Sequence, residues 1–210
     1  GFDKAVDVQY PVAIENVNRL RGLHPEKSPR ELIAYMNKIY LGAVAASGVG
    51  AGAAAAVPNG NIQIPAALAE LLVFLEASVL YTLSVAEVHG LSTEDIERRR
   101  LLVMSVLLGD AAASATLEPI LARSVPYWGR QIVKAIPMST INKMNKVMGP
   151  RFITKYGTKQ GLVVLGIQLP FLIGSAVGGA GNGLFGWFVV KAAKRILGPP
   201  PETWDAPVAS

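Results

Sequence analysis

The sequence predicts an all-α protein, a compact bundle of about six to eight helices with glycine-rich helix packing. Three observations predict it. Apolar residues recur at helical spacing along most of the chain, an alternating strand pattern is almost absent, and only 17% of the 210 residues are charged. A typical soluble protein has about 25% charged residues. Either the helices bury one another almost completely, or part of the surface is embedded in a membrane.

The first elements are short in this prediction. Tyr10 to Val12 is extended at most, and Ala13 to Leu23 has the apolar spacing of a helix. Ser28 and Glu31 form a capping-box pattern around a proline at the first turn, which starts a helix that continues through Tyr40.

The middle of the chain reads as two longer helices. Residues 42–57 are nearly pure Ala, Gly and Val, and residues 58–61 have turn composition. A helix is predicted from Pro65 to about His89, with Gly90 as its C-cap. The next helix is expected to be capped by Ser92 and Thr93 and to run to about Ala122.

The later part of the chain contains several helix breakers. Pro137 and the pair Gly149-Pro150 are expected to divide it into three short helical pieces: Gln131–Ile136, Ser139–Met148 and Arg151–Tyr156. The domain prediction is an N-terminal arm and short helix at residues 1–30, a helical domain at 31–198 and an irregular tail at 199–210.

Two stretches of 31 residues carry no charged side chain, Ile39–Ala69 and Gln160–Val190. A spanning helix needs about 20 apolar residues, so an integral protein with two spans is one interpretation. However, Pro58 and Asn59 divide the first stretch, and the second consists of two apolar ends around a small-residue centre. A packing element or a re-entrant hairpin at a membrane is therefore the preferred interpretation.

Glycines spaced four residues apart fall on one face of a helix and allow close approach of a second backbone. This pattern predicts helix-packing positions, and a homo-oligomer formed through such faces, at Gly48, Gly52, Gly174, Gly178, Gly179 and Gly183. The alternative is that these glycines mark loops, since glycine inside a helix costs about 1 kcal/mol.

Charge is distributed unevenly. Residues 1–118 hold 9 basic and 13 acidic side chains, whereas residues 119–201 hold 11 basic side chains and no acidic one. Such a block indicates an anionic partner, and lipid headgroups are favoured over nucleic acid or an acidic protein. An ordinary solvated face is the alternative. The predicted lipid-contact residues are Lys134, Lys143, Lys146, Arg151, Phe152, Lys155, Tyr156 and Lys159.

Residues that usually carry catalysis or hold metals are scarce. The chain has no cysteine and two histidines, His24 and His89, and it contains no metalloprotease, Walker or nucleophile-elbow pattern. No metal, cofactor or catalytic residue is therefore predicted. A hydrolase using Glu76, Glu87 or His89 is kept as the enzymatic alternative, and Asp110 is a further carboxylate after an apolar run.

Several short segments of the chain are distinctive: Val85–Gly90, Glu97–Leu102, Leu107–Asp110, Ile136–Asn142, Phe152–Gly157, Pro170–Gly179 with Asn182, and Gly198–Pro200. Together they resemble the blocks of EcsC-family proteins of actinobacterial type, and the resemblance covers roughly residues 40–200. Leu172 departs from the family pattern, because a glycine is expected after Pro170-Phe171.

The resemblance implies a helical bacterial protein, encoded in its name-giving case beside an ABC exporter, and it implies no catalytic residues. We therefore expect a non-enzymatic protein on the cytoplasmic side of the cell membrane. Its expected role is accessory to membrane transport or envelope maintenance, with anionic lipid and a transport complex as partners. The alternatives are a soluble helical lipid-binding module that encloses an apolar ligand and the integral two-span protein.

Overall fold

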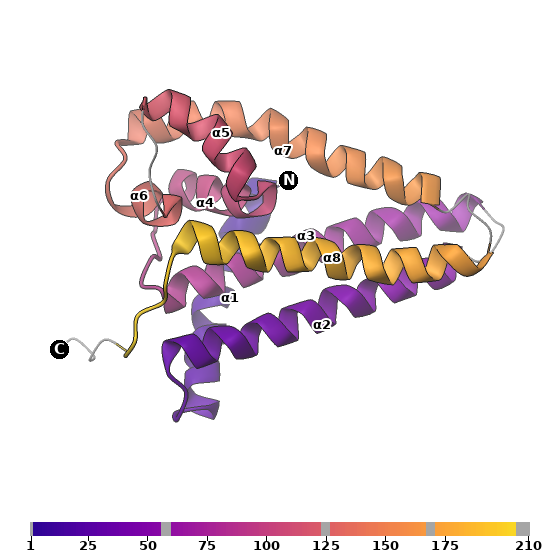
Figure 1. The fold of residues 1–210 in the computed structure, drawn as a ribbon, viewed down its shortest axis with the longest axis horizontal. Coiled ribbons are helices and arrows are strands. Elements are labelled where there is room, and N and C mark those ends of the chain that lie inside the picture. Colours follow the sequence, from indigo (N-terminus) through magenta and orange to yellow (C-terminus); the bar gives the residue numbers. More distant parts are fainter. Residues whose placement is uncertain (1, 56–59, 123–126, 167–170, 205–210) are drawn as a thin grey trace.

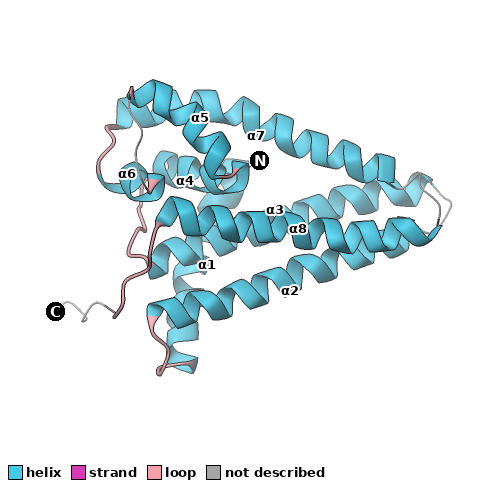
Figure 2. Ribbon diagram, in the orientation of Figure 1, coloured by secondary structure: helices cyan, strands magenta, loops and turns pink. Residues whose placement is uncertain are grey.

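The protein is all-α, as predicted (Figure 2). The computed structural model describes the backbone of residues 2–55, 60–122, 127–166 and 171–204, and the side chains of residues 2–47, 71–122, 127–156 and 183–204. Within these ranges there are eight helices and no strand: α1 (Phe2–Leu23), α2 (Pro29–Ala55), α3 (Gly60–Val88), α4 (Ile96–Leu108), α5 (Asp110–Leu121), α6 (Trp128–Lys134), α7 (Met138–Gly166) and α8 (Phe171–Leu197).

Local hydrogen bonds explain several helix ends. The backbone N–H of Ser28 donates to the carboxylate of Glu31 at 2.8 Å, and the N–H of Glu31 donates to the Ser28 hydroxyl at 3.3 Å, so the capping box is confirmed. Gly90 follows α3 with φ +65°, which confirms its predicted place as the C-cap. The predicted cap of α4 is wrong, because Asp95 accepts from the N–H groups of Glu97 and Arg98.

Two helices are longer than the sequence prediction. Tyr10 to Val12 is not extended, since α1 runs unbroken through Pro11 and buries Val6 and Val17 on one face. Helix α7 likewise continues through Pro150, so the expected break at Gly149-Pro150 is wrong. In both cases burial of a continuous apolar face outweighs the backbone hydrogen bond that proline removes.

One predicted helix is in fact two. The segment expected to run from Ser92 to Ala122 breaks at Gly109, where α4 ends and α5 begins. Gly109 has φ +97° and ψ 154°, a conformation that side-chain-bearing residues avoid. The break leaves the last carbonyl groups of α4 without intrahelical partners, and other elements have to satisfy them.

The long helices form two hairpins, α2–α3 and α7–α8, and the ends joined within each hairpin lie at the same end of the long axis of the molecule (Figure 1). The short helices α4, α5 and α6 gather toward the opposite end. Each uncharged stretch is divided between the two helices of a hairpin: residues 39–69 between α2 and α3, and residues 160–190 between α7 and α8. Neither stretch is a single helix of spanning length.

The pairing of α2 with α8 is the most extensive contact between helices. A Cβ added to Gly186 on α8 would lie 2.6 Å from Val44 Cγ2 on α2, so only glycine allows this approach. The rest of the core is built from large apolar side chains that are almost fully buried, among them Phe74, Leu101, Leu117, Trp128, Ile132 and Met144.

Among the residues that the structure describes, one segment is long and apolar enough to cross a membrane, Leu71–Val88 of α3. Its mean hydropathy is 1.8, and 56% of the segment is buried inside the protein. A buried core helix of a soluble protein has the same properties, so this segment says little about a membrane.

Candidate functional site

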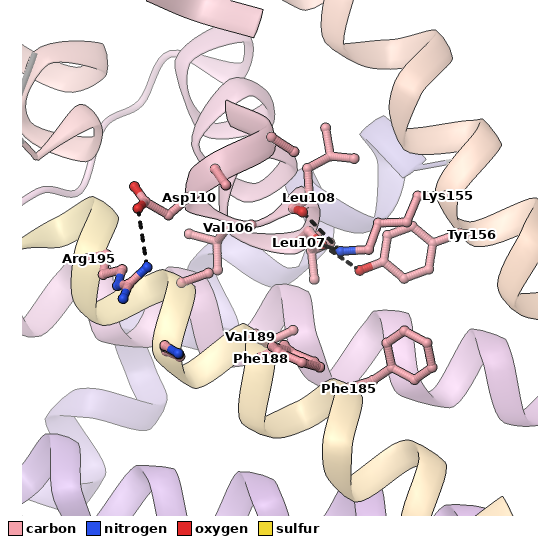
Figure 3. A pocket seen from close by; sticks show the side chains of 15 residues that line it. Val106, Leu107, Leu108, Asp110, Lys155, Tyr156, Phe185, Phe188, Val189 and Arg195 are labelled. Carbon is pink, nitrogen blue, oxygen red and sulfur yellow. Dashed lines mark hydrogen bonds and ion pairs between the residues drawn. The ribbon is translucent and has the colours of Figure 1, made fainter. Parts of the chain in front are cut away.

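A pocket of about 470 Å³ lies where the α4–α5 junction faces α7 and α8 (Figure 3). Its volume is within the range of about 300–1,000 Å³ that is usual for small-molecule sites. Four helices contribute side chains to it, and most of these are apolar. The lining residues are Val106, Leu107, Leu108, Gly109, Asp110, Ala111, Ala112, Lys155, Tyr156, Phe185, Phe188, Val189, Lys191, Ala192 and Arg195.

The end of α4 forms one wall and is held by α7. Lys155 Nζ donates to the carbonyl oxygens of Leu107 at 2.7 Å and Leu108 at 3.0 Å, and the Tyr156 hydroxyl donates to Leu107 O at 2.9 Å. These are carbonyl groups that the break at Gly109 leaves free, at the negative end of the α4 dipole. Burial lowers the pKa of Lys155 and raises that of Tyr156.

Helix α8 forms the opposite wall. Val189 and Ala192 are buried, while Phe188 is 49% exposed although it lines the pocket. Leu184, four residues before Phe188, is also exposed on the same side of the helix, and the exposed Trp187 lies three residues after Leu184. The α8 wall is therefore an apolar surface in contact with water.

Positive charge gathers at one side of the pocket. Arg195 Nη1 lies 3.7 Å from the carboxylate of Asp110, and both side chains are partly exposed. Lys191 lies on α8 one turn before Arg195, and none of the ion pairs found within the described residues includes it. With Lys155, three cations face a single carboxylate. The arrangement of apolar walls and excess cations suits the binding of an amphiphilic anion.

The predicted lipid-contact residues do not form one surface. Lys134 on α6 and Lys143, Lys146 and Arg151 on α7 are exposed, whereas Lys155 is half-buried against α4. The side chain of Lys159 lies outside the described residues.

The prediction of surface aromatics at Phe152 and Tyr156 is wrong. Their exposed fractions are 7% and 5%, and the two rings pack on each other with centroids 4.8 Å apart. Phe152 also packs against Phe2 of α1, at 4.6 Å. The apolar residues that α7 does expose are Val147 and Ile153, at 38% and 71%.

The predicted packing glycines all lie on α2 or α8, the two helices with the most extensive contact. Gly183 is in contact range of Ala45 on α2, since an added Cβ would lie 4.0 Å from that side chain. The contacts of the other predicted positions lie outside the described residues: Gly48, Gly52, Gly174, Gly178 and Gly179. The tightest glycine contact found, at Gly186, was not among the predicted positions.

The residues of the enzymatic alternative are engaged in structural contacts or exposed. His89 Nδ1 lies 2.8 Å from Val85 O and Nε2 lies 3.1 Å from Gly198 O, so the imidazole joins the end of α3 to the segment after α8. Burial lowers its pKa. Glu87 accepts a hydrogen bond from Ser92, and Glu76 is exposed on α3. Within the described ranges no group of three His, Cys, Asp or Glu side chains is placed to hold a metal ion.

Sequence reasoning missed the pocket and most of its residues. The signal that could have found its α8 wall is the helical spacing of Phe185, Phe188, Ala192 and Arg195, in which apolar residues give way to a cation along one face. The facing walls come from positions about 35 and 80 residues earlier in the chain, and no local pattern links them.

Comparison with known proteins adds no assignment to this geometry: no family model, no curated protein and no solved structure matches the chain.

Proposed function

We propose that this protein is a non-enzymatic, membrane-associated helical protein whose uncharged end contacts lipid and whose cations bind anionic headgroups. The observation that carries the proposal is that both uncharged stretches belong to the same end of the molecule (Figure 1). One uncharged hairpin is readily explained by packing. Two such hairpins, far apart in sequence and meeting at one end, leave that end without any charged residue to interact with water.

The size of this end suits insertion into one leaflet. Along α3 the first charged residue, Glu70, comes ten residues after Gly60, and along α7 Lys159 comes seven residues before Gly166. At about 1.5 Å per residue these distances are roughly 15 and 10 Å. Half of a hydrocarbon core of about 30 Å is roughly 15 Å. Helices α2 and α8 are uncharged for longer, over Ile39–Ala55 and Phe171–Val190, or roughly 25 and 30 Å. The charges of α3 and α7 therefore limit the proposed insertion to the depth of a single leaflet.

The charges above this end favour an anionic surface. Helix α7 carries five basic residues and no acidic residue. Each basic residue near an anionic membrane contributes about 1 kcal/mol to binding. Arg151 lies about 22 Å along the helix from Gly166, a height that corresponds to the headgroup layer above a leaflet of about 15 Å.

The biological role follows the resemblance to EcsC-family proteins. We propose a role accessory to membrane transport or envelope maintenance, on the cytoplasmic side of the cell membrane, with no cofactor. The glycine-bearing helices α2 and α8 pair with each other inside the chain, so a homo-oligomer formed through such glycine faces stays a separate proposal.

Vesicle flotation tests the proposal directly. The protein should float with vesicles that contain phosphatidylglycerol and much less with vesicles of phosphatidylcholine alone, and raised salt should weaken the binding. Replacement of Lys143, Lys146, Arg151 and Lys159 by Gln should reduce the bound fraction. Equal flotation of the variant at every salt concentration would contradict the role of the cations.

Two further measurements address topology and partners. Carbonate extraction of native membranes should release the protein, whereas retention in the membrane would support the two-span alternative. Co-purification from native membranes should recover a transport complex if the accessory role is correct, and recovery of the protein alone would count against that role.

A further inference from the structure

We propose that the pocket between the α4–α5 junction, α7 and α8 binds a single-chain anionic amphiphile, an acyl chain that ends in a carboxylate or a phosphate. This site borders the uncharged end, since Phe185, Phe188 and Val189 belong to the stretch 160–190. It takes up one lipid molecule, so it does not depend on the proposed binding to a bilayer. The sequence left open a lipid-binding module that encloses an apolar ligand, and this pocket is where such a ligand would bind.

The apolar part of the pocket suits an acyl chain. Val106 on α4, Ala112 on α5 and Val189 on α8 line it with aliphatic groups, and Phe188 presents an aromatic ring that is 49% exposed. Covering exposed apolar surface contributes about 25 cal/mol for each Å² removed from water. An acyl chain lying against Phe188 would bury the part of the α8 wall that water now contacts.

The cations at the pocket favour a ligand with a negatively charged headgroup. Lys191 Nζ lies 4.8 Å from the centroid of the Trp187 ring, and it belongs to none of the ion pairs found in the described part of the chain. Arg195 is 58% exposed, and its single contact with Asp110, at 3.7 Å, is longer than a good hydrogen bond. Exposed pairs of this kind are worth about 0–1 kcal/mol, so a ligand anion can compete for Arg195.

The order of residues along α8 gives the ligand a direction. Arg195 and Lys191 lie toward the end of α8, and every residue of the helix before Lys191 is uncharged. The head therefore lies near Arg195 and Lys191, and the chain passes Phe188 and Phe185 toward the uncharged end. Lys155 contributes positive charge to the pocket while its ammonium group caps α4, and it is not needed as a direct ligand.

The experiment uses monomeric probes and isothermal titration calorimetry on the full chain, below the critical micelle concentration of each probe. Oleate and oleoyl-lysophosphatidylglycerol are the two anionic probes, and oleyl alcohol is the neutral probe with the same chain. Ala111→Trp places a large ring at the pocket from an exposed position of α5. Phe188→Ser, also exposed, is a second variant in case Ala111→Trp does not fold.

The charge test has a matched control. The double variant Lys191→Gln with Arg195→Gln removes two cations from the pocket, and Lys134→Gln with Lys143→Gln removes two exposed cations that do not line it. We expect the pocket pair to lower the affinity for an anionic probe at least tenfold. The control pair should change that affinity less than twofold. Ala111→Trp or Phe188→Ser should lower the affinity for the anionic probes at least tenfold.

The outcomes show which anionic head the pocket prefers, and they distinguish binding in the pocket from binding to a bilayer. Preference for oleate identifies a carboxylate ligand, and preference for the lysolipid identifies a phosphate ligand. Three results would overturn the inference. They are no binding of either anionic probe, binding of oleyl alcohol as tight as that of oleate, or binding that neither the Lys191/Arg195 pair nor the apolar variants weaken. Vesicle flotation of Ala111→Trp distinguishes the two proposals, because this variant changes no charge and should still float. Loss of vesicle binding alone would leave the pocket result intact.

Discussion

The ammonium group of Lys191 lies over the indole ring of Trp187, with Nζ 4.8 Å from the ring centroid. Trp187 is 47% exposed and contacts Phe188 edge-on, with centroids 5.2 Å apart. Lys191 is the first charge after the uncharged stretch 160–190. Tryptophan and lysine are enriched where an apolar surface meets lipid headgroups. Trp187 lies roughly 24 Å along α8 from Phe171, close to the height given above for Arg151, so this pair indicates the level of the proposed headgroup layer.

Tryptophan fluorescence should therefore report binding to vesicles. The emission of the wild type should shift to shorter wavelength with anionic vesicles, and lipids brominated near the headgroup should quench it more than lipids brominated near the chain end. Trp187→Phe, at an exposed position, should lose most of this response, because Trp128 is buried and Trp204 bonds to Lys27 O. An unchanged response in Trp187→Phe would place the boundary elsewhere.

Cations at different heights should contribute unequally to vesicle binding. Arg151 and Lys159 lie nearer the uncharged end of α7 than Lys134 and Lys143 do. Replacing Arg151 and Lys159 by Gln should cost about 1 kcal/mol each, or roughly fivefold in affinity. Replacing Lys134 and Lys143 by Gln should change the affinity for vesicles less than twofold. Equal effects of the two pairs in flotation would indicate docking along the side of α7 instead.

The contact of Gly186 with Val44 predicts a stability change. Gly186→Ala should destabilise the fold by about 1–3 kcal/mol, because its Cβ would overlap the Val44 side chain and the cost of overpacking exceeds the gain in helix propensity. Gly42→Ala is the matched control on α2, with no atom within 4 Å of its added Cβ. It should stabilise the protein by about 0.5–1 kcal/mol.

Urea denaturation measures both changes. The double variant Gly186→Ala with Val44→Ala should recover part of the loss, since the shortened side chain on α2 leaves room for the new methyl group. Equal stability of Gly186→Ala and Gly42→Ala would contradict the close approach of α8 to α2.

Lys155→Met should destabilise the protein although it keeps an unbranched apolar stem. The substitution removes the donor shared by Leu107 O and Leu108 O, and a buried polar group without a partner costs about 1–3 kcal/mol. The exposed substitution Lys143→Gln should stay within about 0.5 kcal/mol of the wild type. Thermal unfolding followed by circular dichroism compares the two, and similar values would show that Lys155 does not cap α4.

His89 predicts a dependence of stability on pH. Burial lowers its folded-state pKa below the ordinary value of 6.5. Well above pH 6.5 the imidazole is neutral in both states and contributes no pH dependence. As the pH falls below 6.5 the unfolded chain takes up a proton before the folded protein does, so stability decreases until the pH passes the folded-state pKa.

The variant His89→Gln isolates this effect because it keeps a donor but does not titrate. Between pH 7.5 and pH 5.5 the wild type should lose more stability than the variant, as measured by urea denaturation at each pH. Parallel loss in both proteins would contradict a lowered pKa for His89.

The parts of the fold that were predicted correctly depend on neighbours in sequence. The capping box of Ser28 and Glu31 and the C-cap at Gly90 act within three or four residues, so the sequence contains the whole interaction. The uninterrupted courses of α1 through Pro11 and of α7 through Pro150 were not predicted, because distant packing partners compensate for the proline.

The candidate site was harder to predict for the same reason. In the sequence Phe152 and Tyr156 are interleaved with lysines, a pattern typical of surface aromatics. They are buried because α1 and α3 provide aromatic partners, Phe2 for Phe152 and Phe74 for Tyr156. The break at Gly109 lies inside a run that reads as one helix, and the pocket exists only because of that break. No spacing rule connects it to Phe188 on α8.

The hairpin arrangement of the uncharged stretches has a consequence for how the protein would reach a membrane. In a hairpin the chain enters and leaves an apolar layer from one side, so no charged segment between Lys38 and Glu70, or between Lys159 and Lys191, has to be carried through hydrocarbon. Insertion of such an end needs no translocation channel and can be reversed. The same molecule could then exchange between the membrane and the aqueous phase after its synthesis is complete.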